Sequence, residues 1–422
     1  MSIYTVEVIE VDRKSSSLPE SLSLVLESPS SGVNFNSSLN IKGWAVDRAS
    51  SECPLKIRIK YGNCILDSVA SESRPDVAEA LEIKNQLPQF GFQICIPLSD
   101  DSIHINLFLD GLEYGVYKII SRRTRSPVVG KKEWLFLDAK KNELDFFGIK
   151  KRKLFYSWDA YFKNIRSVLS RYTEAICFLI APSKEKVFSD YYPRHTSKLD
   201  VAEYLQRNYR EVVFPLESLG SQREMSFSKG DTHWSDFGAA LAAASLLEKL
   251  GFTHEQCQKL FKFKYTLKKE LGDLSDKVIQ SNPGWVYVAD LEKTKERMTF
   301  KNEAQHFGSI VIIENESALS EKCCLIFGSS SSSRNLIYFL SIFYSRVVFV
   351  HSAGRIDRKI LFHESADHII LQTNQRFLNK PMDFEISISS VLNGLYEQGY
   401  SKKYISSGSE KNKFYEDLVN IS

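Results

Sequence analysis

In the stretch CCLIFGSSSSSRNLIYFL, residues 323–340, an apolar run ends at Gly328, five serines follow, and a helical pattern begins near Arg334. A serine at such a strand-to-helix turn lies at the carboxyl edge of a sheet, where open α/β folds place their sites. Backbone N–H groups at the new helix start can hold an oxyanion, and the helix dipole favours negative charge there. A flexible polar loop is the alternative interpretation, and the stretch by itself leaves both open.

On either side of this stretch, short apolar runs alternate with helical patterns. Continuous apolar strands interleaved with helices predict an α/β fold of three layers, a parallel sheet with helices on both faces. The expected strands are 134–137, 175–180, 212–214, 309–313, 324–327, 347–350 and 368–372, and the expected helices are 158–171, 198–208, 236–250, 254–261 and 334–343. The most apolar tract, 336–350, is interrupted by Ser341, Ser345 and Arg346, which favours a buried helix followed by a strand over a membrane span.

The first part of the chain has a different period. Between residues 21 and 121 apolar residues alternate, turn signals separate the runs, and only 77–81 suggests a helix. This pattern predicts an all-β, immunoglobulin-like sandwich. Its expected strands are 22–26, 39–46, 55–61, 92–96, 103–109 and 114–120. We therefore expect a leader or stray strand over 1–20, a β-sandwich over 21–121, a linker over 122–130, and an α/β domain over 131–422.

Composition narrows the classes of function. The chain has 422 residues, too many for one core, with 43% hydrophobic and 25% charged residues and a net charge of +3. This balance gives no electrostatic reason to expect nucleic acid or an anionic membrane as a partner. The N-terminus lacks a secretory signal, and the seven cysteines lack zinc-site spacing, so we expect reduced thiols, no metal and a cytoplasmic location.

A second motif lies at residues 229–252, KGDTHWSDFGAALAAASLLEKLGF. Ser235 or Asp236 can cap the helix that follows, which places Asp231 and His233 in the loop before it. In an extended Asp-x-His segment both side chains point to the same side, so the carboxylate can accept the imidazole Nδ1–H and orient the ring. An ordinary capping aspartate beside an exposed histidine is the alternative.

Several blocks in one order resemble a known family. KKEWLFLDAKKN, FLIAPSKEKVFSDYYP, VVFPLESL, DTHWSDFGA, LIFGSSSS and ADHIILQTNQRFL, between residues 131 and 380, look like the SGNH-type alginate O-acetyltransferases (AlgJ/AlgX-like). The resemblance implies that Asp231, His233 and Ser330 form a catalytic triad. The family often has Gly-Asp-Ser or Gly-Thr-Ser where this chain has Gly328-Ser329-Ser330, so Ser329 or Ser331 are the alternative nucleophiles.

Three further side chains in these blocks have open roles. Arg376 ends a block that resembles the family's arginine-containing segment, which implies a substrate-binding or orienting role; a structural salt bridge is the alternative. Trp234 is expected at the substrate-binding side as a pocket wall or core residue rather than a sugar platform. Lys184 is either part of the site or solvated.

The N-terminal region resembles a small β-sandwich module found in bacterial glycan-processing proteins and beside glycosyltransferases. The residues that carry this likeness are Gly43, Trp44, Arg74, Pro75, Asp76, Gly91 and Phe92. We expect structural roles for them, with Trp44 packed in the core and Arg74 in a local contact with Asp76. A sugar-binding role is the alternative to a scaffold.

Together these features predict a serine-dependent O-acyltransferase that acetylates a polysaccharide or glycan through an acyl-serine intermediate. The partners implied are the glycan acceptor, an acyl donor such as acetyl-CoA, and polysaccharide-assembly or glycosyltransferase proteins, with no bound cofactor. An acetylesterase with the same triad, or a non-catalytic glycan-binding subunit, are the alternatives. A nucleotide-sugar enzyme is disfavoured because no DxD pair in a suitable loop and no P-loop is present.

Overall fold

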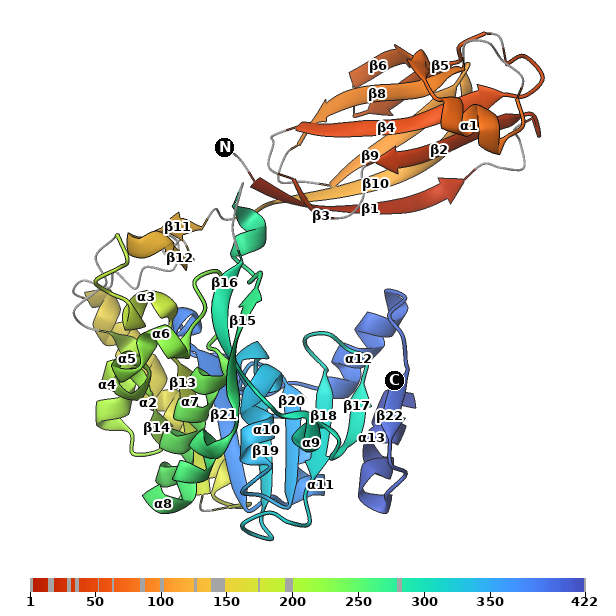
Figure 1. Cartoon of the computed structure of the whole chain (residues 1–422). Coiled ribbons are helices and arrows are strands. Elements are labelled where there is room, and N and C mark those ends of the chain that lie inside the picture. Colours follow the sequence, from red (N-terminus) through yellow and green to blue (C-terminus); the bar gives the residue numbers. More distant parts are fainter. Residues whose placement is uncertain are drawn as a thin grey trace. The chain divides into compact units, whose positions relative to one another are not determined.

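A computed structural model describes the greater part of the chain (Figure 1). The described residues are 3–13, 19–28, 32–34, 38–51, 53–62, 64–83, 88–98, 102–124, 127–137, 149–173, 175–193, 200–278 and 283–420. Contacts divide the chain into two compact units, Met1–Ser126 with Asp276–Ser281, and Pro127–Ser275 with Asn282–Ser422.

The first unit is built from two antiparallel sheets, which confirms the predicted β class. A six-stranded sheet has the order β3-β1-β10-β9-β5-β6, and a four-stranded sheet has the order β2-β4-β8-β7. The strands are β1 (Ile3–Arg13), β2 (Leu22–Ser28), β3 (Gly32–Asn34), β4 (Ser38–Asp47), β5 (Lys56–Tyr61), β6 (Cys64–Val69), β7 (Glu72–Ser73), β8 (Gln89–Pro97), β9 (Ser102–Leu109) and β10 (Leu112–Thr124). Both sheets contribute alternate residues to one apolar core, among them Ile41 and Ile57.

The residues that carry the likeness to a sandwich module have structural roles here. Trp44 is half-buried and packs beside α1 (Pro75–Ala80), whereas Phe92 is the fully buried core residue. Arg74 forms the expected bond with Asp76 and also a two-point ion pair with Glu27, which the sequence did not predict. These contacts tie the helix to β2 and support the scaffold interpretation.

Two segments expected outside the domains belong to strands. Residues 3–13, within the segment expected to be a leader or stray strand, form β1 and pair along almost their whole length with β10. The expected linker 122–130 starts inside β10, which continues to Thr124, and ends after β11 (Val128–Val129). Residues 1–2, 14–18 and 125–126 lie outside the described residues.

The second unit contains an eight-stranded sheet of order β14-β13-β21-β19-β20-β18-β17-β22. Its strands are β13 (Ala175–Ala181), β14 (Val212–Val213), β17 (Met298–Asn302), β18 (Ile310–Glu314), β19 (Cys323–Gly328), β20 (Arg346–His351), β21 (His368–Asn374) and β22 (Tyr404–Ser406). The five strands from β14 to β20 run parallel, as expected, whereas β18, β17 and β22 add on in antiparallel pairs. The sheet is therefore mixed but mostly parallel.

Helices cover both faces of this sheet, which confirms the predicted three-layer α/β class (Figure 1). Successive strand residues alternate between two cores; in β19, Cys324 and Ile326 face one core, and Leu325 and Phe327 face the other. The first core includes α7 (Asp236–Lys249) and α10 (Ile337–Leu340). The second includes α2 (Ile149–Leu169), α4 (Val201–Asn208), α11 (Arg358–Glu364), α12 (Ile388–Glu397) and α13 (Glu410–Asn420).

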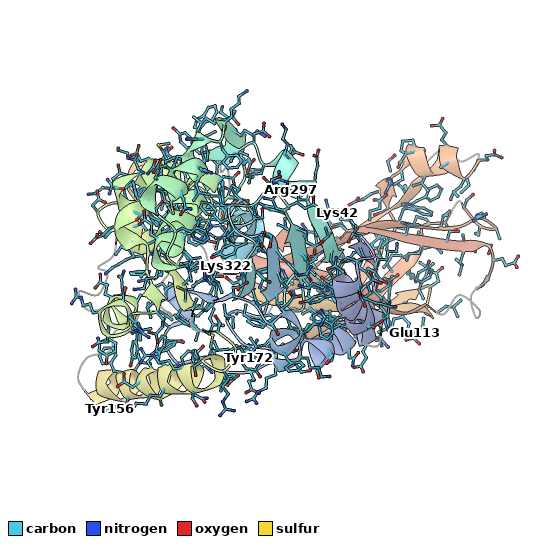
Figure 2. All side chains as sticks on the ribbon, turned by 90° about the horizontal axis from the view of Figure 1, so that it is seen from below. Lys42, Glu113, Tyr156, Tyr172, Arg297 and Lys322 are labelled. Atoms are coloured by element: carbon cyan, nitrogen blue, oxygen red, sulfur yellow. The ribbon has the colours of Figure 1, made fainter. Side chains whose placement is uncertain are left out.

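The helix α2 illustrates how these outer helices are held. Trp158 is fully buried on its inner face, and Tyr156, two residues earlier, is 71% exposed (Figure 2). A helix with one apolar face and one solvated face packs on a sheet in this way. Residues 198–199, the start of the expected helix 198–208, lie outside the described residues.

The other β-strands and α-helices are short or lie beside the sheet. They are β11, β12 (Leu135–Phe136), α3 (Lys184–Val187), α5 (Leu216–Ser221), α6 (Arg223–Ser226), α8 (His254–Cys257), β15 (Tyr265–Glu270), β16 (Gly284–Ala289) and α9 (Glu292–Lys295). All seven cysteines are free thiols. Within the described residues, every helix is too short or too polar to cross a lipid bilayer.

Candidate active site

The DTHW loop and the serine run meet at the edge of the sheet, although they lie 97 residues apart in the chain. The His233 Nδ1 and Asp231 Oδ1 atoms are 2.7 Å apart, and the His233 Nε2 and Ser330 Oγ atoms are 2.9 Å apart. An ionised carboxylate can only accept, so Nδ1–H donates to Asp231 and Nε2 is left to accept the Ser330 hydroxyl proton. The three side chains therefore form one continuous hydrogen-bonded chain.

Local sequence explains why the loop has this shape. Ser235 caps α7 by accepting the Gly238 N–H, as expected, so the three residues before the cap stay outside the helix. Asp231 Oδ1 also accepts the backbone N–H of His233 at 2.7 Å, a short-range turn that aspartate favours. The carboxylate thus fixes both the backbone and the ring of His233.

The charge of Asp231 is stabilised although its side chain is only 16% exposed. Burial by itself would raise the pKa of this carboxyl, but the hydrogen bonds and charge of His233, with the Arg334 guanidinium, hold the pKa well below its usual range. Arg334 donates to Asp231 Oδ2 at 3.2 Å. The aspartate is therefore ionised across the whole physiological pH range.

The serine run is ordered by two amide side chains of β21. The hydroxyls of Ser329 and Ser332 donate to Gln372 Oε1 at 2.9 and 3.0 Å, and the hydroxyl of Ser331 donates to Asn374 Oδ1 at 2.9 Å. Within the run, Ser330 is the serine whose hydroxyl reaches His233. Geometry therefore favours Ser330 over both neighbours, and the alternative of a flexible polar loop does not describe this segment.

A helix begins directly at the serine run. It starts at Ser330, passes through a π-helical turn, η6 (Ser332–Leu336), and continues as α10, earlier than the start expected at residue 334. The first intrahelical bond comes from Ser332 N–H to the Ser329 carbonyl at 2.9 Å. The N–H groups of Ser330 and Ser331, as the first two of the helix, have no intrahelical acceptor. π-Helical turns often occur at functional sites.

Trp234 and Arg376 occupy different environments. Trp234 is 5% exposed, belongs to the apolar core and donates its Nε1–H to the Ser331 carbonyl at 3.0 Å. Trp234 lines the pocket and joins the DTHW loop to the serine run through this hydrogen bond. Because its ring is buried, it does not offer a platform for a sugar. Arg376 is half-buried, and burial lowers its pKa although the charges of Asp273 and Glu185 oppose this. Among the described residues the structure shows no ion pair of Arg376 with these carboxylates.

Two residues that the sequence did not assign hold the loop. Asp273, in the segment after β15, accepts the backbone N–H of Thr232 at 2.7 Å and its hydroxyl at 2.5 Å. Lys184, for which a solvated position was one alternative, is 2% exposed and bonds to the loop's carbonyl groups. The PSK block gave a signal for Lys184, whereas Asp273 lies in an unremarkable polar stretch.

Asp231, His233 and Asp273 also offer three ligand atoms that lie within 4.8 Å of one another. Thr232, His233 and Arg334 already donate to these carboxylates. A metal ion would have to displace those donors and compete with the guanidinium charge of Arg334. The arrangement therefore suits proton transfer better than cation binding.

A pocket of about 300 Å³ adjoins the loop. Its lining is mixed, with acidic, basic and apolar side chains from the loop, the β15–β16 hairpin, α9 and the new helix, including His233, Trp234, Leu271, Val286, Lys295 and Arg334. Ser333 and Tyr338 line another hollow, of about 950 Å³. His233, which bonds to Ser330, thus lines the first pocket, and Ser333 of the serine run lines the second.

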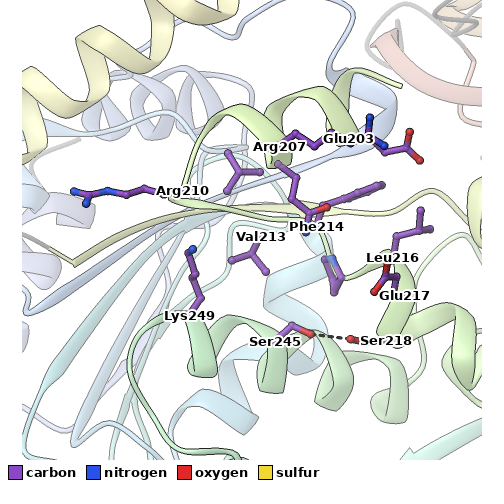
Figure 3. Close-up of a pocket in the computed structure, with 13 residues that line it drawn as sticks. Glu203, Arg207, Arg210, Val213, Phe214, Leu216, Glu217, Ser218, Ser245 and Lys249 are labelled. Atoms are coloured by element: carbon purple, nitrogen blue, oxygen red, sulfur yellow. Dashed lines mark hydrogen bonds between the residues drawn. The ribbon is translucent and has the colours of Figure 1, made fainter. Parts of the chain in front are cut away.

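Another hollow, of about 610 Å³, lies at the sheet edge beside β14 (Figure 3). Arg207, Arg210 and Lys249 line it, and a hydrogen bond of 3.0 Å joins Ser218 and Ser245 at one side. It contains none of the residues predicted for the site and no serine–histidine pair. Its volume alone does not make it the candidate active site.

Comparison with known proteins supports the family resemblance. Residues 128–309 match the family model described as SGNH hydrolase-like domain, acetyltransferase AlgX. The matched range contains Asp231 and His233 but ends before Ser330. The resemblance predicted from the sequence is therefore confirmed over this range, and a match to an acetyltransferase domain suggests an enzyme.

Solved structures give more distant similarities. The O-acetyltransferase domain of Pseudomonas putida AlgJ is 15% identical with a TM-score of 0.41, over 71% of this chain and 100% of that one. Bacillus cereus PatB1 is 15% identical with a TM-score of 0.47, over 62% and 100%. Pseudomonas aeruginosa AlgX is 16% identical with a TM-score of 0.33, over 61% and 63%. Among curated proteins, none matches this chain significantly.

Proposed function

We propose that this protein is a serine-dependent O-acetyltransferase that transfers an acetyl group to a hydroxyl of a polysaccharide or glycan. The observation that carries the proposal is the continuous chain of hydrogen bonds from Asp231 through His233 to Ser330, with links of 2.7 and 2.9 Å. Nucleophile, base and orienting carboxylate in hydrogen-bond reach are the requirement for covalent acyl transfer.

In the first half-reaction, His233 Nε2 removes the Ser330 hydroxyl proton as Oγ attacks the acetyl carbonyl carbon. The carbonyl oxygen becomes an oxyanion, and the N–H groups of Ser330 and Ser331 at the helix start are our candidates to stabilise it. The tetrahedral intermediate then collapses, the imidazolium returns its proton to the leaving group, and Ser330 is left acetylated. Asp231, which stays ionised, stabilises the imidazolium throughout.

In the second half-reaction, a glycan hydroxyl takes the place of the leaving group. His233 accepts the proton of that hydroxyl, its oxygen attacks the acetyl carbon, and the acetyl–Ser330 bond breaks as the proton returns to Oγ. The products are an O-acetyl ester and the free serine. Water in place of the glycan would make the same site an esterase.

The groups around the triad suggest how substrates are held. We propose Trp234 as a pocket wall, because it joins the core to the serine run, and Arg376 as a substrate contact, because its guanidinium lies over the Phe377 ring without an ion pair among described carboxylates. We propose an activated acetyl ester or thioester as donor, with acetyl-CoA as the first thioester to test. In both half-reactions His233 accepts and returns the proton.

The test compares transfer with hydrolysis. The purified chain is mixed with 4-nitrophenyl acetate or acetyl-CoA and a panel of oligosaccharides, and mass spectrometry quantifies acetylated sugar against free acetate. We expect acetylated sugar to exceed acetate with at least one acceptor. Acetate alone, under every condition, would make the protein an esterase.

Matched serine variants test whether the triad is catalytic. A fluorophosphonate probe should label the wild type and Ser329→Ala but not Ser330→Ala. Ser329→Ala removes a hydroxyl that bonds to Gln372, so it tests for a non-specific effect of altering the run. Absence of labelling and turnover in the wild type would leave a non-catalytic glycan-binding subunit.

A further inference from the structure

Lys184 is a buried lysine outside the triad, and it donates hydrogen bonds to the backbone segment that carries Asp231. Lys184 lies in the first turn of α3, directly after β13, and is 2% exposed. Its Nζ donates to the carbonyl oxygens of Ser228, Lys229 and Asp231 at 3.1, 3.0 and 2.6 Å. An ammonium group has three N–H donors, so these three carbonyls use all of them.

The surroundings of Lys184 make its charge costly. The rings of Trp134 and Phe136 lie 5.6 Å from Nζ, and no described carboxylate forms an ion pair with it. Glu185, Asp231 and Asp273 are the charged groups that act on it through space. Burial lowers its pKa to about 8, although those three carboxylates oppose the shift. An apolar side chain would avoid this desolvation cost, which calls for a reason beyond stability.

One of the three hydrogen bonds of Lys184 reaches the backbone of Asp231, the first residue of the candidate site. The Asp231 carbonyl is held on one side by Lys184, and on the other side Asp273 holds the next residue through the Thr232 N–H. The peptide between Asp231 and Thr232 is therefore fixed at both its oxygen and its nitrogen. The position of this peptide determines where the Asp231 carboxylate and the His233 ring lie.

We propose that Lys184 is a positioning residue for acyl transfer, whose ammonium group holds three carbonyl groups of the 228–231 segment and thereby aligns the Asp231–His233 pair on Ser330. This inference rests on the proposed function. It assigns Lys184 no contact with substrate and no proton transfer. Its effect is on kcat, because a misplaced base slows the chemical step, and a displacement of about 1 Å can cost roughly 10²-fold.

The main test substitutes Lys184→Met, which keeps the length and apolar stem of the side chain and removes the three donors. We expect kcat for 4-nitrophenyl acetate to fall roughly 10²-fold with KM nearly unchanged, because the pocket residues are intact. The matched control is Lys186→Met in the same short helix. Lys186 pairs with Glu203 at 3.0 Å and with Asp200 at 3.7 Å, and none of its side-chain ion pairs among the described residues is with the loop, so its variant should keep wild-type kcat.

The dependence of kcat on pH is a second test, because a lysine with a purely structural role would not affect it. A neutral amine has two N–H donors for three carbonyls, so kcat of the wild type should fall as pH rises through about 8. Stability should change in the opposite direction. Because the folded pKa lies below the unfolded value of about 10.4, the unfolded chain binds more protons between these values, and stability contributed by this group rises with pH there.

Lys184→Arg distinguishes charge from shape, because the guanidinium stays protonated. With this variant the fall in kcat above pH 8 should disappear, whatever its absolute activity. Wild-type kcat in Lys184→Met would overturn the proposal. If Lys184→Met does not fold, the wild-type profile decides, and a kcat that stays level from about pH 7 to 10 overturns the proposal. A wild type without any Ser330 labelling would instead contradict the proposed function itself.

Discussion

Asp231 keeps its charge in a mostly buried position because donors reach both of its oxygens. His233 donates to Oδ1 through its backbone and its ring, and Arg334 donates to Oδ2. Charge-assisted hydrogen bonds of this kind are the stronger class in proteins. The same bonds fix which nitrogen of His233 carries the proton, so a single carboxylate determines both the ring orientation and the tautomer of the base.

Replacing Asp231 by Asn should therefore separate geometry from charge. We expect kcat to fall roughly 10³- to 10⁴-fold, because an amide permits the wrong tautomer and does not stabilise the imidazolium. Steady-state kinetics with 4-nitrophenyl acetate measures this change. A loss of less than tenfold would mean that Asp231 does not orient the base.

The same variant has a pH signature in stability. The folded pKa of Asp231 is lowered, so its contribution to stability is complete above the ordinary carboxyl pKa of about 4 and is lost as pH falls through the folded value. The difference in free energy of unfolding between wild type and Asp231→Asn should thus be largest near neutral pH and shrink in acid. Urea unfolding at several pH values measures it, and a constant difference would contradict this account.

At the scale of elements, close packing at two glycines, Gly230 and Gly272, holds the DTHW loop against the segment after β15. A Cβ on Gly272 would lie 2.3 Å from the Gly230 carbonyl oxygen, and a Cβ on Gly230 would lie 1.9 Å from Ser275 Oγ. This close approach lets the N–H groups of Leu274 and Ser275 donate to the Gly230 carbonyl at 2.9 and 3.2 Å. The segment after β15 is thereby attached to the DTHW loop.

Gly272→Ala should disturb this attachment. We expect a loss of about 1–3 kcal/mol in the free energy of unfolding, as for other overpacked sites, with a larger effect on kcat because the loop shifts. The matched control is Gly220→Ala in α5, where nothing lies within 4 Å of the added Cβ and alanine favours the helix. Equal stability and kcat in the two variants would show that the close packing does not position the loop.

At the scale of the whole molecule, the sequence predicted the two kinds of fold and the three triad candidates but not their supports. The period of two predicted the β class of the first unit, and the alternation of strands and helices predicted the α/β class of the second, because both patterns are local in the sequence. β15, with the sequence YTLKKE, is mostly exposed and lacks apolar alternation, so nothing marked the hairpin that carries Asp273. Gln372 and Asn374 lie on β21 and meet the serine run through tertiary packing alone.

The serine itself shows the same limit. Residues 329–333 are chemically identical, and only the resemblance to a family singled out Ser330 from the sequence. In the structure, the hydroxyls of Ser329, Ser331 and Ser332 donate hydrogen bonds to the side-chain amides of β21, and the hydroxyl of Ser330 bonds to His233. The three residues of the hydrogen-bonded chain lie in two short motifs that the sequence shows directly, whereas the side chains that fix the geometry come from distant segments.

The central claim is that Ser330 carries the acyl group, and trapping the intermediate tests it most directly. The protein is mixed briefly with 4-nitrophenyl acetate, quenched in acid, digested, and the peptide containing residues 329–333 is sequenced by tandem mass spectrometry. The account predicts one acetyl group on Ser330, absent from Ser330→Ala and strongly reduced in His233→Ala. Turnover by the wild type with the acetyl group on another residue, or with none on this peptide under conditions that trap it elsewhere, would contradict the account.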